Sequence, residues 1–378
     1  MLRPHSPPRT RPGRGGAGRA VALIAVALLA ACSGDDATDT ADSVAPSSAA
    51  PTTSSVEATA TATEAPTTVA PTTAAHTTEP APVYAATIDE LLTLGRPIVL
   101  AHTAGEDEFP ASTLFAFGES VKAGVDVLDL NVLLTGDGQL LVQHDDTVDR
   151  NTSGTGAVAD LTYAEINTLD AAYWFTSACS DCRDRPDDEY LYRGIRTGAV
   201  PPPDGYTADD FVLPTLPMLI ERFPTIPLNI EIKGSGDAAR AAADVLAQVL
   251  HDTDRAQASV VASFDDEIVS YFHTIAPDIE VSPGLGVLTS WVLDGTPVPD
   301  GMRILQLPPE YSGLTVITPE LVTASIDAGY VIWVWPNDRA LENQAAYLDF
   351  LDQGIQGLNI NFPAQGVAAV AEYLAAQG

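Results

Sequence analysis

Residues 127–145 have the sequence VLDLNVLLTGDGQLLVQHD, which combines an apolar strand, a tight turn and a returning strand. Asp129 and Asn131 interrupt the first apolar run and lie two residues apart. Because successive side chains of a strand point to opposite faces, these two polar groups share one face. Gly136-Asp137-Gly138 is typical of a turn. The apolar run then resumes at Leu140 and ends with His144, so a second polar group returns beside the first strand.

Short apolar runs and helical stretches alternate on both sides of this segment. Further buried strands are predicted at residues 97–102, 227–233, 259–264, 304–307, 330–335 and 357–361. Helices are predicted at residues 112–123, 162–169, 237–251 and 265–275. Gly124 is expected to end the first helix, and Thr162 with Glu165 has capping-box spacing in the second. Repeated strand–helix units over residues 86–378 predict one α/β domain, a TIM (β/α)8 barrel.

One stretch, from about residue 173 to about residue 211, breaks this alternation with Pro201-Pro202-Pro203 and several glycines. We interpret it as an inserted loop region, and long insertions of this kind usually shape the mouth of a barrel. The region contains Cys179 and Cys182 as a lone C-x-x-C pair, without the second pair that a zinc site requires. A small disulfide loop in an oxidising compartment is therefore the preferred interpretation.

Residues 1–31 are typical of a lipoprotein signal peptide. A basic leader precedes the apolar run Val21–Ala30, which is too short to span a bilayer as a helix. Leu29-Ala30-Ala31-Cys32 resembles the bacterial lipoprotein box, so we predict lipidation of Cys32 and an extracytoplasmic, membrane-anchored protein. An ordinary secretory signal with an unrelated cysteine is the alternative. Residues 32–85 are rich in Thr, Ala, Ser and Pro and are predicted to form a disordered linker.

The formal net charge of the chain is −33, from 18 basic and 51 acidic residues. A chain with this balance is not expected to bind nucleic acid or an anionic membrane surface through general electrostatics. An anionic substrate would therefore require a bound metal or a local basic group to offset the repulsion.

Polar residues occur where the predicted strands end. His102 ends the strand at 97–102, His144 ends the returning strand, and Glu231 and Lys233 share one face of the strand at 227–233. In a barrel these strand ends meet at one mouth. A hard cation held by carboxylate and amide oxygens would compensate for burying such a set, and two imidazoles beside it could transfer protons. Taken singly, each residue could instead have a structural role, such as a turn cap or a buried ion pair.

Together these residues resemble the glycerophosphodiester phosphodiesterase family over Pro97 to Pro363. The resemblance rests on motifs at matching spacing: His102-Thr103-Ala104, Pro110-Ala111-Ser112-Thr113, Asp129-Leu130-Asn131, His144-Asp145, the run Asp149 to Gly156, Glu231-Ile232-Lys233, Ser263-Phe264-Asp265, Trp333-Val334-Trp335, and Gly354 to Gly357. It implies that His102 and His144 form the acid–base pair. It also implies that Asp129, Asn131 and Glu231 hold calcium or magnesium, and that Lys233 contacts the substrate phosphate.

The chain departs from the family pattern at several of these positions. Thr103 replaces an arginine, Ala111 a glutamate and Asn131 an aspartate, and Asn359-Ile360-Asn361 stands where the family has Thr-Asp. Fewer anionic ligands should weaken the binding of a divalent metal. The acidic loop Glu106–Glu108 could supply replacement ligands, although we favour the interpretation that it is solvated.

The resulting hypothesis is a metal-dependent hydrolase that cleaves a glycerophosphodiester to glycerol 3-phosphate and an alcohol through two histidines. One alternative is a catalytically impaired barrel that acts as a ligand-binding lipoprotein. Another is a phosphodiesterase that acts on a different lipid or on a cell-wall phosphodiester, with specificity set by the inserted loops.

Overall fold

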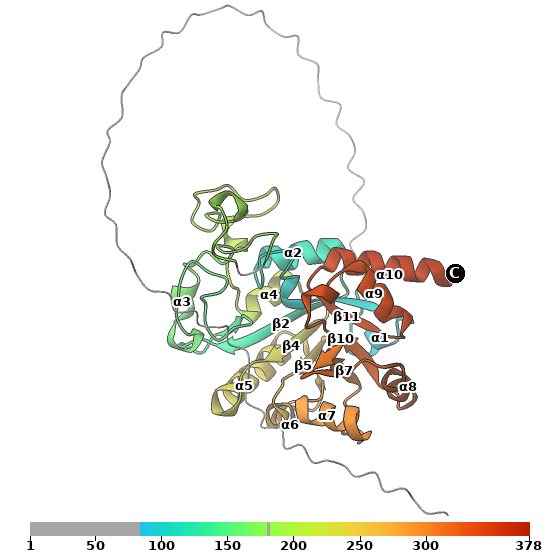
Figure 1. The fold of residues 1–378 in the computed structure, drawn as a ribbon. Helices are drawn as coiled ribbons and strands as arrows, with labels where there is room; N and C mark the ends of the chain where they lie inside the picture. Colours follow the sequence, from blue (N-terminus) through green and yellow to red (C-terminus); the bar gives the residue numbers. More distant parts are fainter. Residues whose placement is uncertain (1–83, 180–181) are drawn as a thin grey trace, which may run out of the picture. The chain divides into compact units, whose positions relative to one another are not determined.

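The computed structural model describes residues 84–179 and 182–378 (Figure 1). The predicted signal peptide, Cys32 and the linker up to residue 83 lie outside the described residues. Tyr84 and Ala85, the last residues of the predicted linker, already pack against the hydrophobic core. Within the described residues, no helix is both long and apolar enough to cross a membrane.

In the described part of the chain, eight parallel strands form the wall of a barrel, as the sequence predicts. They are β1 (Ile98–Ala101), β2 (Val127–Leu134), β4 (Leu228–Ile232), β5 (Ser259–Ala262), β6 (Glu280–Val281), β7 (Ile304–Leu307), β10 (Val331–Val334) and β11 (Gly357–Ile360). The hydrogen-bonded order is β6-β5-β4-β2-β1-β11-β10-β7. Between the two outermost strands, Ser282 Oγ donates to the Ile304 carbonyl (3.0 Å), and the Arg303 backbone N–H donates to Glu280 Oε1 (3.3 Å). These contacts bring the barrel close to closure.

Helices surround the strands on the outside (Figure 1). They are α1 (Ile88–Leu92), α2 (Leu114–Ala123), α3 (Tyr163–Ile166), α4 (Leu216–Arg222), α5 (Gly236–Asp252), α6 (Asp266–Ile275), α7 (Leu285–Asp294), α8 (Pro319–Asp327), α9 (Gln344–Asp352) and α10 (Pro363–Gln377). Helix α2 ends at Gly124 in a left-handed conformation (φ 97°), as predicted. The capping box of Thr162 and Glu165 is present, but α3 ends at Ile166, three residues before the predicted end.

Strand β6 is the main element that the sequence analysis misses. It has only two residues and lies in a segment without a recognisable apolar run, so periodicity cannot detect it. A small hairpin of β8 (Glu310–Tyr311) and β9 (Leu314–Thr315) follows β7 and was also not predicted. The strand predicted at residues 140–144 is shorter than expected, since β3 spans Leu140–Val142.

Strands β2 and β3 form an antiparallel hairpin that extends beyond the barrel wall. Val132 pairs with Val142 and Leu134 with Leu140. An antiparallel strand would ordinarily carry its end away from the mouth, but β2 is eight residues long and extends past the neighbouring β4. Strand β3 therefore returns to the level of the mouth, where the Gln143 N–H donates to the Asn131 carbonyl (3.0 Å). This hairpin places His144 beside the ends of the parallel strands.

The barrel interior is apolar at its N-terminal end and polar at its C-terminal end. Leu100, Val127, Val260, Ile304 and Trp333 form one buried cluster, and α1 packs on it through Ile88 and Leu91. Because side chains alternate with a period of two, residues two and four positions further along these strands face the same interior. Those positions hold the polar residues of the predicted site.

The inserted region has a small aromatic core of its own. Phe211, Ile195 and Tyr206 pack with Phe115 of α2, which attaches the insertion to the barrel. Arg193 lies over the rings of Tyr173 (4.2 Å), Tyr190 (3.7 Å) and Trp174 (4.9 Å). Such cation–π contacts let a guanidinium pack among aromatic rings.

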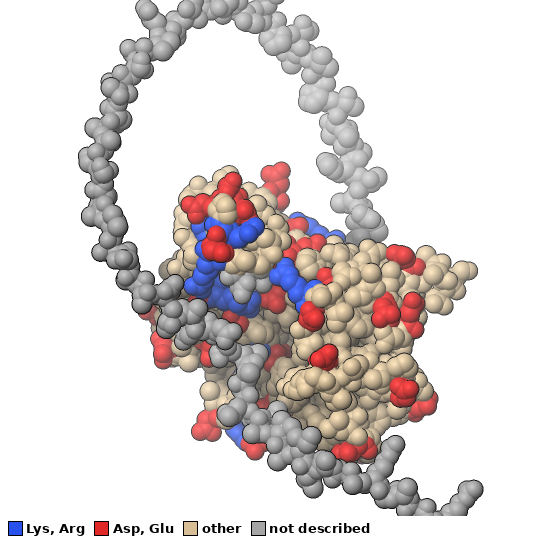
Figure 2. All heavy atoms as spheres, in the orientation of Figure 1, with Lys and Arg blue, Asp and Glu red and all other residues tan. Residues whose placement is uncertain are grey.

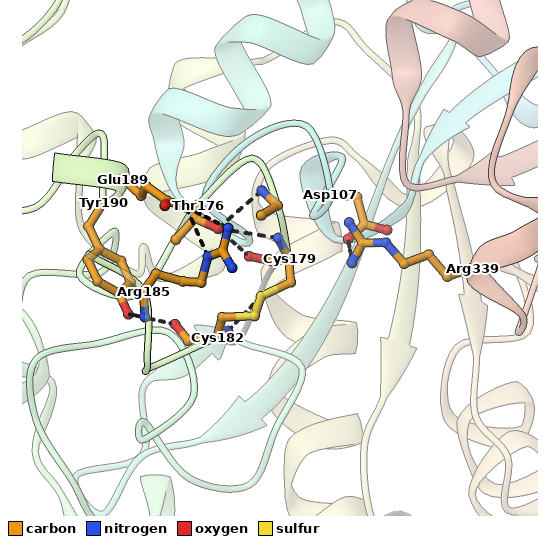
Figure 3. The surroundings of a disulfide bond; sticks show 9 residues. Asp107, Thr176, Cys179, Cys182, Arg185, Glu189, Tyr190 and Arg339 are labelled. Carbon is orange, nitrogen blue, oxygen red and sulfur yellow. Dashed lines mark hydrogen bonds and ion pairs between the residues drawn. A yellow bond between two sulfur atoms is a disulfide. The ribbon is translucent and has the colours of Figure 1, made fainter. Parts of the chain in front are cut away.

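A disulfide closes the short loop between Cys179 and Cys182 (Figure 3). Thr176 Oγ1 accepts hydrogen bonds from the backbone N–H groups of Ala178 (3.1 Å) and Cys179 (3.3 Å). On the other side, the Tyr190 hydroxyl donates to the Cys182 carbonyl (3.1 Å). The loop is thereby attached to the rest of the insertion at both cysteines.

The glycine at position 357 is required by close packing inside the barrel. A Cβ at Gly357 would lie 2.3 Å from Cδ1 of Trp333, whose ring is almost completely buried. We expect Gly357→Ala to lower the free energy of unfolding by about 2–3 kcal/mol, because overpacking a full core forces side chains out of their rotamers. Chemical denaturation would measure the change. In a Trp333→Leu background, Gly357→Ala should lower the free energy of unfolding by less. An equal decrease in both backgrounds would contradict the packing explanation.

Candidate active site

The predicted site residues meet at the C-terminal end of the barrel. The His102 and His144 ring centroids are 6.4 Å apart. Lys233 Nζ lies 3.4 Å from His144 Nε2 and 3.3 Å from Glu231 Oε1. The Thr103 N–H, next to His102, points to Asp129 Oδ2 at 3.5 Å. Residues that are far apart in the sequence therefore form one cluster, as the strand pattern predicted.

His102 is held by an amide. Its Nδ1–H donates to Asn361 Oδ1 (2.7 Å), while Asn361 Nδ2 donates to Asp107 Oδ2 (3.0 Å) and so sets the orientation of the amide. This pattern puts the ring proton on Nδ1 and leaves Nε2 free. Burial lowers the pKa of His102, but the Glu106 and Asp129 carboxylates outweigh burial, so the pKa is raised above its ordinary value.

The backbone just after His102 is strained. Thr103 has φ 43° and Ala104 has φ 69°, in the left-handed region that glycine favours and a β-branched residue avoids. Strain of this kind persists only where surrounding structure imposes it, and it clusters at functional sites. Here the two left-handed residues end β1 and turn the chain into the loop that carries Glu106.

His144 is held by a carboxylate. Its Nδ1–H donates to Asp145 Oδ1 (2.7 Å), and Arg150 Nε donates to Asp145 Oδ2 (2.7 Å). Burial raises the pKa of Asp145, but the hydrogen bonds from His144 and Arg150 outweigh it and hold this pKa well below its ordinary range. Asp145 therefore stays ionised and keeps the His144 proton on Nδ1, so that Nε2 faces Lys233.

The three predicted metal ligands lie on two adjacent strands, with Asn131 directly beside Glu231 in the register of β2 and β4. Asp129 is 5 % exposed, and burial raises the pKa of its carboxyl above the ordinary value. The Asn131 amide is buried, and its Nδ2 has no hydrogen-bond partner. Among the described residues there is no cluster of three or more His, Cys, Asp and Glu arranged to hold a metal ion. The predicted set has only two carboxylates, because Asn131 contributes an amide.

Two amides that the sequence analysis did not single out, the buried Asn229 and the half-buried Gln306, line the interior below this set. Asn229 Nδ2 donates to Asp129 Oδ1 (2.5 Å) and to Gln306 Oε1 (2.9 Å), and Gln306 Nε2 donates back to Asn229 Oδ1 (2.9 Å). Asn229 shares the inner face of β4 with Glu231, and Gln306 is the polar residue of the otherwise apolar β7. A polar residue at an inward-facing position of a predicted strand was the signal that could have identified them. Their hydrogen bonds hold one oxygen of Asp129 in place.

We expected the acidic loop after β1 to be solvated, and this expectation was wrong for Glu106 and Asp107. The Glu106 side chain is 15 % exposed, and Asp107 is 3 % exposed. Asp107 accepts from Asn361 and forms an ion pair with Arg339 (2.7 Å), whereas Glu106 lies between His102 and Arg150. The loop folds back over the mouth because both carboxylates find charged or polar partners there.

Glu342 is a further buried carboxyl at the site, and no sequence motif indicated it. Its Oε2 accepts from the Asn361 backbone N–H (3.0 Å) and the Tyr347 hydroxyl (2.5 Å), whereas Oε1 has no partner. Burial raises its pKa to about 7. The folded protein therefore favours the neutral carboxyl. The contribution of Glu342 to the free energy of unfolding is fully present below pH 4.5, where the unfolded chain is also protonated, and is lost as the pH rises through about 7.

We therefore expect Glu342→Gln to change the pH dependence of stability. The rise from 4.5 to about 7 corresponds to about 3 kcal/mol, so the variant should gain up to that much relative to wild type between pH 4.5 and pH 8. Urea denaturation at several pH values would measure the difference. Glu221→Gln on the exposed side of α4 is the control. Parallel curves for wild type and Glu342→Gln would contradict the assignment.

Basic side chains gather near the insertion despite the acidic composition of the chain. Figure 2 shows Lys and Arg concentrated on and beside the inserted loops, while Asp and Glu are spread over the visible face. The Arg183 guanidinium donates to the Asp149 carbonyl (2.6 Å), next to Arg150. Several of these groups are ion-paired, as Arg185 is with Glu189 (2.8 Å) and Arg196 with Asp209 (2.6 Å), so part of their charge is compensated locally.

The sequence profile of the glycerophosphoryl diester phosphodiesterase family matches residues 102–365, which include every predicted residue of the mouth. The chain belongs to this family. As a family member it is a phosphodiesterase-type enzyme, a hydrolase of phosphoric diesters.

Individual relatives agree with the family assignment. A putative glycerophosphodiester phosphodiesterase of Bacillus subtilis is 30% identical over 196 residues, which cover 50% of this chain and 68% of the relative. A glycerophosphodiester phosphodiesterase of Caldanaerobacter subterraneus is 28% identical over 253 residues, or 65% of this chain and 87% of the relative.

Solved structures agree in fold. A phosphodiesterase of Oleispira antarctica, determined in complex with the product sn-glycerol-3-phosphate, has a TM-score of 0.55 at 20% identity and covers 73% of this chain and 97% of its own. A glycerophosphodiester phosphodiesterase of Agrobacterium tumefaciens has a TM-score of 0.53 at 22% identity, covering 72% of this chain and 99% of its own. At these identities the likeness concerns the barrel fold.

Proposed function

We propose that this family member hydrolyses glycerophosphodiesters to sn-glycerol 3-phosphate and an alcohol, with His102 and His144 as the two proton carriers. The observation that carries the proposal is the pair of imidazoles, 6.4 Å apart at the barrel mouth, each with Nδ1 engaged. The names of the relatives and the product bound in the Oleispira enzyme support the choice of substrate.

The proton transfers follow from the hydrogen bonds of the two rings. With Nδ1–H donated to Asn361 or Asp145, each neutral imidazole has its lone pair on Nε2. One Nε2 can accept a proton from the attacking water as its oxygen bonds to phosphorus. The other imidazole, when protonated, can donate its proton to the alcohol oxygen as the P–O bond to the departing group breaks.

Lys233 is proposed to contact the phosphate. Its ammonium group lies between Glu231 and His144, at 3.3 Å and 3.4 Å, so that it stands beside one proton carrier. The arginine expected at position 103 from the family pattern is absent, and Thr103 Oγ1 is buried without a partner. Lys233, directly after the end of β4, is then the cation proposed to contact the phosphate.

The residues Asp129, Asn131 and Glu231 are proposed to hold one calcium or magnesium ion. The fit rests on the buried Asp129 carboxyl, whose pKa burial raises, on Glu231 of the adjacent strand, and on the side-chain oxygen of Asn131, which stands beside Glu231 in the register. Oxygen-rich sets of this kind suit hard cations. When bound, the ion would polarise a phosphoryl oxygen and offset negative charge in the transition state. The chain itself orients Asp129 through the amide of Asn229, which Gln306 holds in turn.

The membrane location remains part of the proposal. The signal-peptide pattern with Cys32, the linker composition and the Cys179–Cys182 pair all support an exported, lipid-anchored enzyme. Mass spectrometry of the mature N-terminus tests this, because an unmodified peptide that begins elsewhere than Cys32 would rule out the anchor.

The activity is tested with purified full-length protein and glycerophosphodiesters that carry different alcohols. Release of sn-glycerol 3-phosphate in the presence of calcium or magnesium is the expected result. Release of phosphate-bearing products from phospholipids or cell-wall polymer alone would favour the other substrates considered above. Binding by calorimetry without turnover under any metal would favour the ligand-binding protein.

A further inference from the structure

Arg150 connects two loops of the mouth. It lies in the segment after β3, and different nitrogens of its guanidinium donate hydrogen bonds to two carboxylates. Arg150 Nε donates to Asp145 Oδ2 at 2.7 Å, and Nη1 donates to Glu106 Oε2 at 3.0 Å. Glu106 belongs to the loop after β1, so the arginine joins segments that approach each other only in the folded barrel.

Each of these carboxylates also faces a histidine with its other oxygen. Asp145 Oδ1 accepts from His144 Nδ1 at 2.7 Å. Glu106 Oε1 lies 3.7 Å from His102 Nδ1, which is hydrogen-bonded to Asn361 Oδ1 at the shorter distance of 2.7 Å. The result is a continuous series from His144 through Asp145, Arg150 and Glu106 to His102.

The guanidinium is what allows two carboxylates to remain ionised in this place. Burial raises the pKa of Glu106, but Arg150 and the two histidines outweigh burial and lower it below its ordinary value. Without Arg150 the two acidic groups would lose their shared counter-ion beside the imidazoles, and each would be free to rotate or take up a proton. The planar guanidinium suits this bridging role better than an ammonium group, since its donors are fixed in a fork.

The inserted region supports the bridge from the other side. Arg183 donates to the carbonyl of Asp149 (2.6 Å), and Asp149 Oδ1 accepts from the Gly156 N–H (2.8 Å). Asp149, directly before Arg150, is therefore held by two hydrogen bonds.

We propose that Arg150 is a positioning residue that fixes the orientation of both His102 and His144 through Glu106 and Asp145. The role rests on the proposed two-histidine reaction. Position 103, which is threonine here, supplies no guanidinium, and among the described residues Arg150 is the arginine that contacts carboxylates facing both histidines.

The kinetic test compares Arg150→Ala, Arg150→Lys and Glu106→Gln in the full-length protein. Arg150→Ala should lower kcat by about 100-fold with little change in KM, because small displacements of reacting groups cost about that much. Arg150→Lys should recover part of the loss, since one ammonium can satisfy one carboxylate at a time. Glu106→Gln should lower kcat by about tenfold. The double variant Arg150→Ala/Glu106→Gln should lose less kcat than the product of the two single losses, because both changes disturb the same contact.

The matched control is Arg303→Ala. Arg303 also bridges two carboxylates, Glu280 (2.6 Å) and Asp89 (2.7 Å), but it lies at the opposite end of the barrel, away from both histidines. Its removal should leave kcat unchanged after correction for any loss of folded protein. An equal loss of kcat in Arg303→Ala and Arg150→Ala would show a structural effect and overturn the proposal.

A second readout does not depend on turnover. The ¹⁵N chemical shifts of histidine side chains report which ring nitrogen carries the proton. In the wild type we expect both His102 and His144 to be protonated on Nδ1, and in Arg150→Ala we expect a mixture of tautomers. Unchanged shifts would overturn the positioning role. A wild type without any hydrolysis but with shifts that respond to Arg150→Ala would refute the proposed function and leave the positioning role standing.

Discussion

Replacing either His102 or His144 by alanine is expected to lower kcat by about 1,000-fold or more, to the limit of detection. General acid–base catalysis contributes about 100- to 10,000-fold per positioned group, and here each imidazole is proposed to transfer one of two protons. KM should change little, because the imidazoles act mainly when charge develops in the transition state. Steady-state kinetics with a glycerophosphodiester substrate would measure both parameters.

His251→Ala serves as the control for these variants. His251 lies in the last turn of α5, exposed and paired with Asp278 (3.1 Å), so its removal should leave kcat unchanged. The variant that lacks both His102 and His144 should be about as inactive as either single variant, since the residues act as a unit. Wild-type rates in either single variant would exclude the two-histidine mechanism.

Asp129→Asn and Glu231→Gln are expected to cause the second-largest loss, about 100-fold at limiting metal concentrations. Both changes keep the shape of the side chain and remove one negative charge from the proposed cation site. Asp129→Asn can still accept the hydrogen bond from Asn229 through its remaining oxygen, so the barrel interior should stay intact. The loss should therefore appear as a shift of the metal activation curve to higher concentrations of calcium or magnesium.

Metal titration of the hydrolysis rate, after treatment with a chelator, would measure this shift. Asp300→Asn, in an exposed loop between α7 and β7, removes the same charge from a place remote from the mouth and is the control. The metal assignment would be wrong if the chelated wild type kept full activity. It would also be wrong if Asp129→Asn and Asp300→Asn required the same metal concentration.

The fold and the predicted site residues could be read from the order of strands and from alternation within them. In β2, apolar residues on both faces with Asp129 and Asn131 on one face specify a buried strand with a polar interior position. The same reasoning applies to Glu231 and Lys233. Convergence then follows, because the ends of parallel strands in one barrel meet at one mouth.

The hairpin of β2 and β3 was predicted from its turn, and His144 was predicted at the mouth, but the reason why it lies there was not. A returning strand should carry His144 away from the mouth, and only the extra length of β2 brings it back to Asn131. How far one strand extends past its neighbour depends on how the strands pair in the sheet, so it cannot be predicted from the residues of one strand.

The sequence by itself determined the barrel, the side to which each strand residue points and therefore the groups on the inner face. These features can be predicted because the alternation of side chains along a strand depends only on neighbouring residues. Only the tertiary structure decided the surroundings of those groups. The loop with Glu106 and Asp107 looked suited to solvent, yet it folds inward because Arg150, Asn361 and Arg339 compensate its charges there. Glu342 is buried for a similar reason, with Tyr347 and Asn361 as its donors. Apart from Tyr347, which lies five residues away in α9, these partners are remote in the sequence, and no local periodicity reveals which of them will meet.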